Sequence, residues 1–149
     1  MPDPVRGYSG VSEYTARADH QHKEPSKQVW LPVLKQGATI TTTYSGNLVK
    51  KSKDKIIDAT ANIDCSTAGA AANLIEFDLP YAVPVAPAAV GDFVFTDAGV
   101  ILYVGVLYAI TGVRCVFIAG NQTNYLGLAP VYTISIGDSL QLNLHYFSV

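Results

Sequence analysis

Two histidines separated by one residue are the side chains of this sequence best suited to bind a metal ion. His20 and His22 lie in the segment Arg17-Ala18-Asp19-His20-Gln21-His22. In an extended strand, residues i and i+2 point to the same side, and imidazole is the commonest protein ligand of transition metals. Three chains meeting on a threefold axis would present six imidazoles to one octahedral ion. The alternative, which we favour, is that both histidines form local hydrogen bonds and Asp19 orients one of them. No other cofactor is expected.

No recognisable hydrolytic or phosphate-binding motif is present in the sequence. It has no Gly-x-Ser-x-Gly elbow, no phosphate-binding loop and no His-Glu-x-x-His. Asp58 and Asp64 share one strand face, but their spacing puts them roughly 20 Å apart, beyond the roughly 5–10 Å between paired glycosidase carboxylates. His145 could act as a base, yet no nucleophile is identifiable beside it. We therefore expect a protein that is not an enzyme.

Four lysines cluster at a predicted hairpin tip, at positions Lys50, Lys51, Lys53 and Lys55. One interpretation is contact with an acidic capsid surface or a host polysaccharide. The other, which we favour, is a solvated turn that discourages pairing between sheet edges. Three tyrosines near loops could stack on sugar rings: Tyr81, Tyr125 and Tyr132. These residues are the candidates for glycan contact.

Charge is scarce and unevenly distributed over the 149 residues. The net charge of −2 gives no reason to expect nucleic acid or an anionic membrane as a partner. Charged residues make up 15% of the chain, against roughly 25% in typical soluble domains. From Ala98 to Val149, only Arg114 and Asp138 are charged. Such a surface predicts burial against further copies of the chain.

Cys65 and Cys115 lack metal-ligand spacing and are expected to be buried free thiols.

The pattern of residues divides the chain into an arm, 1–28, and a β-domain, 29–149. Proline and glycine punctuate the arm, which shows no signal-peptide pattern and has no core of its own. It is expected to order on binding a partner. Its predicted attachment residues are Tyr8, Tyr14, Arg17 and Asp19.

The β-domain reads as many short strands separated by turns, with no helical period. Ile57, Ala59, Ala61, Ile63 and Cys65 alternate with polar residues, which is typical of a half-solvated antiparallel strand. Leu140, Leu142, Leu144 and Tyr146 alternate in the same way with Gln141, Asn143 and His145. Gly46-Asn47 and Ser52-Lys53-Asp54 are predicted turns. Strands are also predicted at 39–44, 48–51, 73–79, 93–96, 113–119, 125–128 and 131–136. The predicted fold is an all-β antiparallel sandwich of jelly-roll type.

The segment Val100 to Ile110 is apolar at nearly every position. A strand of this kind is central in its sheet or carries a subunit interface on its second face. We expect the second arrangement, in a homotrimer, with Val104 and Leu107 at the interface.

Two parts of the sequence resemble structural proteins of tailed bacteriophages. The segment GVSEYTARADHQH is similar to the Ala-Arg-Ala-Asp-His-x-His-Pro boundary that precedes knob domains in phage fibre and decoration proteins, although Lys23 stands in place of the proline. The second part comprises WLPVL, TTTYSGNLVKKSKDKIIDATANID, IEFDLPY and GDSLQLNLHYFSV. Together these segments resemble the small trimeric β-domains of phage fibre ends and capsids.

The resemblance implies a virion component that assembles in the host cytoplasm. The chain has no room for a shaft, which favours a trimeric capsid decoration or cement protein. Its partners would be itself, the major capsid protein or other virion proteins, with no nucleic acid and no membrane. The alternative is a short tail-fibre or baseplate tip that binds host surface glycans.

Overall fold

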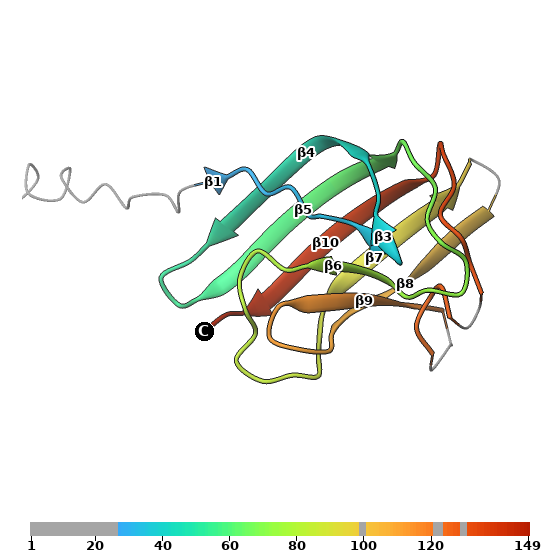
Figure 1. The fold of residues 1–149 in the computed structure, drawn as a ribbon. Coiled ribbons are helices and arrows are strands. Elements are labelled where there is room, and N and C mark those ends of the chain that lie inside the picture. The colour runs from blue at the N-terminus through green and yellow to red at the C-terminus, as the bar shows by residue number, and fades with distance from the viewer. Residues whose placement is uncertain (1–26, 99–100, 121–123, 129–130) are drawn as a thin grey trace, which may run out of the picture.

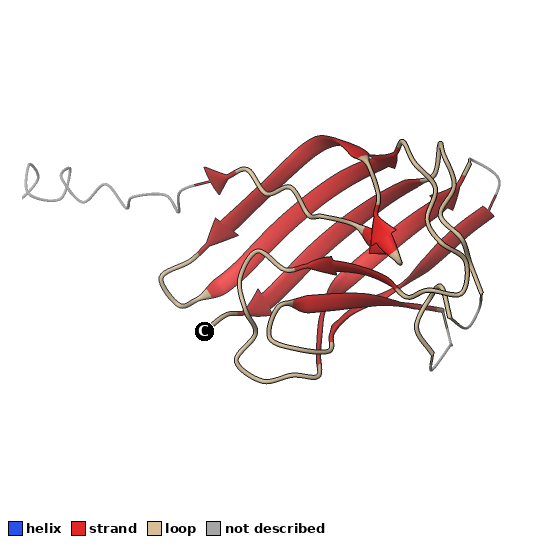
Figure 2. Ribbon diagram, in the orientation of Figure 1, coloured by secondary structure: helices blue, strands red, loops and turns tan. Residues whose placement is uncertain are grey.

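A computed structural model describes residues 27–98, 101–120, 124–128 and 131–149. These residues form one antiparallel sheet that curls over itself, and no helix occurs among them. Figure 1 shows β4, β5, β10, β7 and β8 as a broad layer, with β6 and β9 lying across it; Figure 2 shows the same arrangement by element type. The all-β antiparallel class is therefore confirmed, with both layers built from a single continuous sheet.

Five of the strands are long and make up the broad layer: β4 (Thr42–Lys51), β5 (Ile56–Cys65), β7 (Ala88–Asp97), β8 (Ile101–Ala109) and β10 (Ser139–Phe147). The shorter strands are β1 (Lys27–Gln28), β2 (Lys35–Gln36), β3 (Ala38–Thr39), β6 (Ile75–Asp78) and β9 (Arg114–Ala119). Their order across the sheet is β1-β4-β5-β10-β7-β8-β9-β6-β2-β3. β10, the most C-terminal of these strands, therefore lies between β5 and β7.

Alternation along β5 and β10 positions the core as the sequence predicts. Ile57, Ala59, Ala61, Ile63 and Cys65 are all buried, as are Leu140, Leu142, Leu144 and Tyr146. The two strands pair directly, with Leu142 opposite Ala61 and Leu144 opposite Ala59. Inward residues thus meet inward residues across the ladder, which leaves a polar outer face on the same two strands.

Aromatic rings fill the space between the two layers. The ring of Phe93 on β7 packs edge-on against Phe117 on β9, with centroids 5.0 Å apart. Phe117 contacts Phe77 on β6, which contacts Trp30. This row joins β7 of the broad layer to β9, β6 and the segment before β2. Edge-on aromatic pairs contribute beyond the area that they bury.

Gly46-Asn47 does not form the predicted turn. It is a bulge inside β4, where the register with β5 shifts between Ser45 and Leu48. Gly46 has a φ of +65°, a conformation that both tight turns and bulges require of glycine. Asn47 is buried, and its side-chain oxygen accepts the backbone N–H of Asn62. The turn predicted at Ser52-Lys53-Asp54 is confirmed, because the backbone N–H of Ser52 donates to Ile56.

Two other predicted strands are absent from the structure. Segments 125–128 and 131–136 are not strands; 125–128 contains a turn, and 131–136 has no ladder partner. Segment 29–34, with which the β-domain was expected to begin, alternates buried Trp30 and Leu34 with exposed residues and is not a strand. Lys27 and Gln28 pair with β4, although we placed them in the arm. The described part of the domain therefore begins two residues before the predicted boundary.

A buried carboxylate holds the segment 131–138 against the sheet. Asp138 is fully buried. One of its oxygens accepts the Tyr132 hydroxyl at 2.5 Å and the Ser135 N–H at 2.7 Å, and the other accepts the Ala98 N–H at 2.9 Å. The Asp138 carbonyl accepts the Cys65 N–H at 2.8 Å. The network joins the end of β5, the end of β7 and the start of β10.

A buried amide holds the other side of this segment. The Gln36 side chain on β2 is fully buried. It donates to the carbonyls of Tyr132 and Asn73 and accepts the N–H of Ile134 at 2.9 Å. Backbone groups that lack a ladder partner are thus satisfied by one side chain, as buried polar groups must be.

Replacement of Asp138 tests this network. In Asp138→Asn, an amide N–H₂ replaces one oxygen and faces groups that also donate. We expect unfolding to require about 2–4 kcal/mol less free energy. Urea denaturation followed by tryptophan fluorescence measures it. Asp64→Asn is the matched control, because Asp64 is exposed on the outer face, and it should change stability by under about 0.5 kcal/mol. Equal effects of the two substitutions would contradict the assignment.

Candidate interaction surface

The outer face of β5 and β10 carries a continuous set of polar side chains. Asp58 and Asp64 on β5 point outward, as do Gln141 and His145 on β10. The Nδ1 atom of His145 lies 2.5 Å from Oδ1 of Asp58. Both side chains are largely exposed. Because no hydroxyl or thiol is hydrogen-bonded to His145 among the described residues, the pair is not a nucleophile-activating arrangement.

A second polar pair lies one step along the same face. Asn143 on β10 donates from Nδ2 to Oδ1 of Asp92 on β7 at 2.8 Å. Beside it, a shallow hollow of about 360 Å³ opens between β4, β5 and β10. Side chains of Leu48, Lys50, Asp58, Thr60 and Asn143 line this hollow. Polar side chains therefore surround the exposed Leu48 side chain and the strand backbone at Ala59 and Leu144, whose own side chains are buried on the inner face.

The outer face of β8 is apolar instead. Leu102, Val104 and Val106 are exposed to 62%, 51% and 43%. They point away from the core on the last strand of the broad layer, which β7 flanks on one side and β9 of the second layer on the other. Val94 on β7 lies opposite Val104, and Ile118 on β9 lies opposite Val106. We call these five residues the β8 apolar patch. Contiguous exposed apolar residues of this kind are typical of interaction sites.

The predicted interface residues on β8 separate onto opposite faces. Val104 belongs to the β8 apolar patch. Leu107 is fully buried in the chain's own core and cannot contact another copy, so its assignment to the interface is wrong. The physical reason is the two-residue period of a strand, which places Val104 and Leu107 on opposite sides. The expectation that β8 is apolar on both faces is otherwise met.

The residues predicted to contact a glycan or a capsid do not form one cluster. Lys50 lines the hollow on the outer face. Lys51 instead places its Nζ atom 4.5 Å from the centre of the Tyr81 ring and 3.4 Å from the carbonyl of Val149. Lys53 is exposed in the turn after β4. Tyr125 is half-buried next to β9, several strands away in the sheet order.

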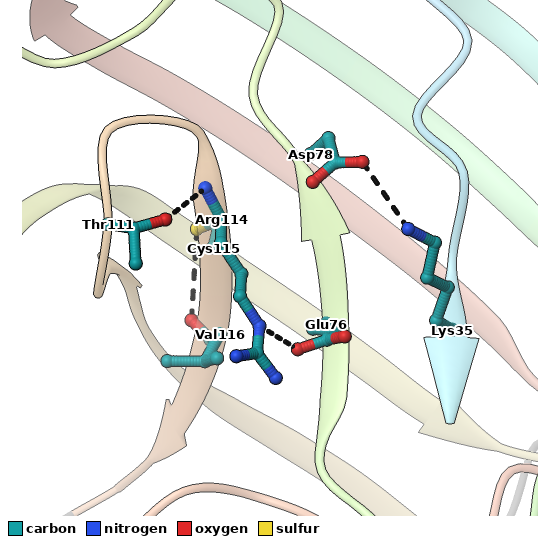
Figure 3. Close-up of polar contacts among 7 residues, drawn as sticks. All are labelled: Lys35, Glu76, Asp78, Thr111, Arg114, Cys115 and Val116. Atoms are coloured by element: carbon teal, nitrogen blue, oxygen red, sulfur yellow. Dashed lines mark hydrogen bonds and ion pairs between the residues drawn. The ribbon is translucent and has the colours of Figure 1, made fainter. Parts of the chain in front are cut away.

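Ion pairs link the strands of the second layer. Figure 3 shows Arg114 on β9 with Glu76 on β6, and Lys35 on β2 with Asp78 on β6. The same view shows the Arg114 N–H donating to the Thr111 hydroxyl at 3.2 Å. Exposed pairs of this kind add little stability. They neutralise one another, so this layer presents no strongly charged patch at β6.

Residues predicted in the arm lie outside the described part of the chain. This applies to Tyr8, Tyr14, Arg17, Asp19, His20 and His22. Within the described ranges, no group of three or more histidine, cysteine or acidic residues could hold a metal ion. The same ranges contain no helix that is long and apolar enough to cross a membrane.

Comparisons with protein-family models, with curated proteins and with solved structures found no match to this chain. The β8 apolar patch and the hollow beside Asn143 are thus defined by their own geometry. Of their members, the sequence predicts only Val104 and Lys50 as site residues. The period-two pattern of β5 and β10 is the signal that could have located Asp58 and Asn143 on one face.

Both cysteines are free and buried, as the sequence predicts. Burial, together with the charges of Asp138 and Asp64, raises the pKa of the Cys65 thiol from 9.0 to about 12. Burial raises the pKa of the Cys115 thiol as well. Since the thiolate is the reactive form, neither cysteine is suited to nucleophilic chemistry.

The raised pKa of Cys65 predicts a loss of stability in alkali. The folded state keeps the thiol proton to about pH 12, whereas the unfolded chain releases it near pH 9. The stabilising contribution is therefore complete below about pH 9 and is lost as pH rises toward 12. Urea midpoints measured from about pH 8 to 11 should fall more steeply for the wild type than for Cys65→Ala. Parallel curves would show that this thiol is not the cause.

Proposed function

We propose that this chain is a non-enzymatic structural protein of a bacteriophage virion. It forms a homotrimer that decorates and stabilises the capsid, with the arm docked on the major capsid protein and the β-domain displayed outward. The observation that carries the proposal is the β8 apolar patch. Exposed apolar side chains in the middle of a sheet face favour association, because burial removes them from water.

The partner that best fits the patch is a second copy of the same chain. The patch carries no charged side chain, so it is complementary to itself. Asp138 is buried, which leaves Arg114 as the one exposed residue with a permanent charge among those described after Ala98. A large surface with so little charge fits contact between copies. The resemblance to trimeric phage domains adds the threefold symmetry.

The arm has a separate role in the proposal. Its resemblance to the boundary segment of phage adaptor regions assigns it to attachment. The β-domain has a core of its own, so attachment and folding can reside in different parts of the chain. A protein that binds only the assembled shell stabilises that shell by its binding free energy. The binding free energies of many copies on one particle would add together and raise the resistance of the particle to heat.

Association through the β8 apolar patch can be tested by one substitution. Light scattering of the wild type should give about three times 15.9 kDa. Val104→Asp would place an unpaired charge in the interface, and we expect it to shift the protein to monomer. Ser45→Asp adds the same charge on the same sheet face, at an exposed position of β4, which is separated from β7 by β5 and β10, and should leave the trimer intact. A soluble wild-type monomer at micromolar concentration would contradict the proposal.

The stabilising role is tested on particles. Phage particles assembled without this protein should lose infectivity faster on heating and still adsorb to host cells at the normal rate. Adding the purified protein back should restore heat resistance, whereas a form that lacks residues 1–26 should fold but fail to bind. Particles that adsorb poorly and are as heat-resistant as the wild type would instead support the alternative, a tail tip that binds host glycans.

A further inference from the structure

The hollow beside Asn143 has a chemistry that the proposed trimer does not use. We infer that it binds one neutral pyranose residue of a polysaccharide. The hollow involves β4, β5 and β10, whereas the β8 apolar patch lies on β7, β8 and β9. The two surfaces share no residue. The inference therefore goes beyond the structural role proposed above and does not rest on it.

The polar groups of the hollow are held in place before any ligand arrives. The bond from His145 engages Oδ1 of Asp58, which leaves Oδ2 as an acceptor. The bond to Asp92 engages one N–H of Asn143, which leaves its side-chain oxygen and its second N–H. A carboxylate and an amide fixed in this way can each bind neighbouring hydroxyl groups. Groups that are already oriented lose less entropy on binding.

The floor of the hollow is suited to the C–H face of a sugar ring. Leu48 is 41% exposed although its strand lies within the sheet, because the bulge at Gly46-Asn47 resets the register just before it. The backbone of β5 at Ala59 and of β10 at Leu144 forms the rest of the floor, because both side chains are buried on the inner face. An apolar base with a few fixed polar groups is the usual design of a small-molecule site, and about 360 Å³ lies at the lower end of the roughly 300–1,000 Å³ range of such sites.

Charge selects a neutral ring over an acidic one. Lys50 is the permanent cation among the described residues that line the hollow. Two carboxylates, Asp58 and Asp92, lie in it or beside it. The excess of negative charge disfavours uronic acids, sulfate and nucleic acid. Lys50 has its ammonium group available to donate to a hydroxyl oxygen.

A neighbouring apolar hollow gives the polysaccharide room to continue. Asp58 lines the first hollow, and its partner His145 lines a second one of about 290 Å³. Val83, Val85 and Phe147 contribute apolar side chains to the second hollow. The Asp58–His145 pair thus lies between two adjoining hollows, which fits an oligosaccharide better than an isolated sugar.

The test uses the full-length protein and defined sugars. The probes are the methyl glycosides of glucose, galactose, mannose and N-acetylglucosamine, with glucuronic acid as the anionic probe and glycerol as a polyol control. Amide chemical shifts followed by ¹H–¹⁵N NMR report binding. We expect saturable shifts at Thr60, Asn143 and Leu144 for at least one neutral glycoside, with a dissociation constant of about 1–10 mM. Glucuronic acid and glycerol should give none.

Two pairs of variants locate the site. Asn143→Ala and Asp58→Ala should each weaken binding about fivefold to tenfold, since each removes hydrogen bonds to hydroxyls. Gln141→Ala and Asp64→Ala are the matched controls on the same strands and face, and both line a different hollow of about 230 Å³. The controls should bind like the wild type. Retained NMR dispersion in each variant shows that it is folded.

Three outcomes would overturn the inference. The first is that no neutral glycoside gives saturable shifts up to about 100 mM, far above the expected dissociation constant. The second is that glucuronic acid binds more tightly than every neutral probe. The third is that Gln141→Ala or Asp64→Ala weakens binding while Asn143→Ala does not. The test is separate from the test of assembly, because a chain that fails to trimerise still presents the hollow.

Discussion

The requirement that one sheet cover its own inner face shapes the whole molecule. The described residues contain no helix to cover that face, so the sheet must curl until β6 and β9 lie over β7 and β10 (Figure 1). The contact of Phe93 with Phe117 is where the two layers meet, and Phe77 and Trp30 extend it. Large rings can span the roughly 10 Å between packed sheet layers. Once the inner face is filled in this way, the outer face of the broad layer remains free for other contacts.

Features of the fold that depend on alternation were predictable from sequence. Inward and outward residues of β5 and β10 follow directly from a period of two, and the turn at Lys53 follows from its polar residues. Features that depend on distant partners were not. A glycine with positive φ serves a turn and a bulge equally well, so Gly46 alone cannot distinguish them. Segment 131–136 has the residues of a strand, but side-chain hydrogen bonds hold it in place instead of a ladder. One partner, Gln36, is distant in sequence, and the other, Asp138, lies just after the segment.

The candidate surfaces were predictable only in part. The run of apolar residues in β8 predicts that its second face is also apolar, and Val104 lies on that face. The error at Leu107 came from treating an uninterrupted apolar run as a single surface, when its members alternate between two. The hollow beside Asn143 brings Lys50 and Asp58 of the β4–β5 hairpin together with Asn143 and its partner Asp92, which are far from the hairpin in sequence. Only the strand order, with β10 between β5 and β7, makes them neighbours.

The central position of β10 has a kinetic consequence. β5 and β7 pair with residues 139–147 on facing edges, so neither edge is satisfied until this late segment has left the ribosome. Until then, two long strands present open edges, which is the condition under which β-proteins aggregate. Pairing across such sequence separations is also slow, because loop closure precedes any gain from contact. Folding of this domain therefore depends on β10, and a truncation within that strand would prevent the domain from folding.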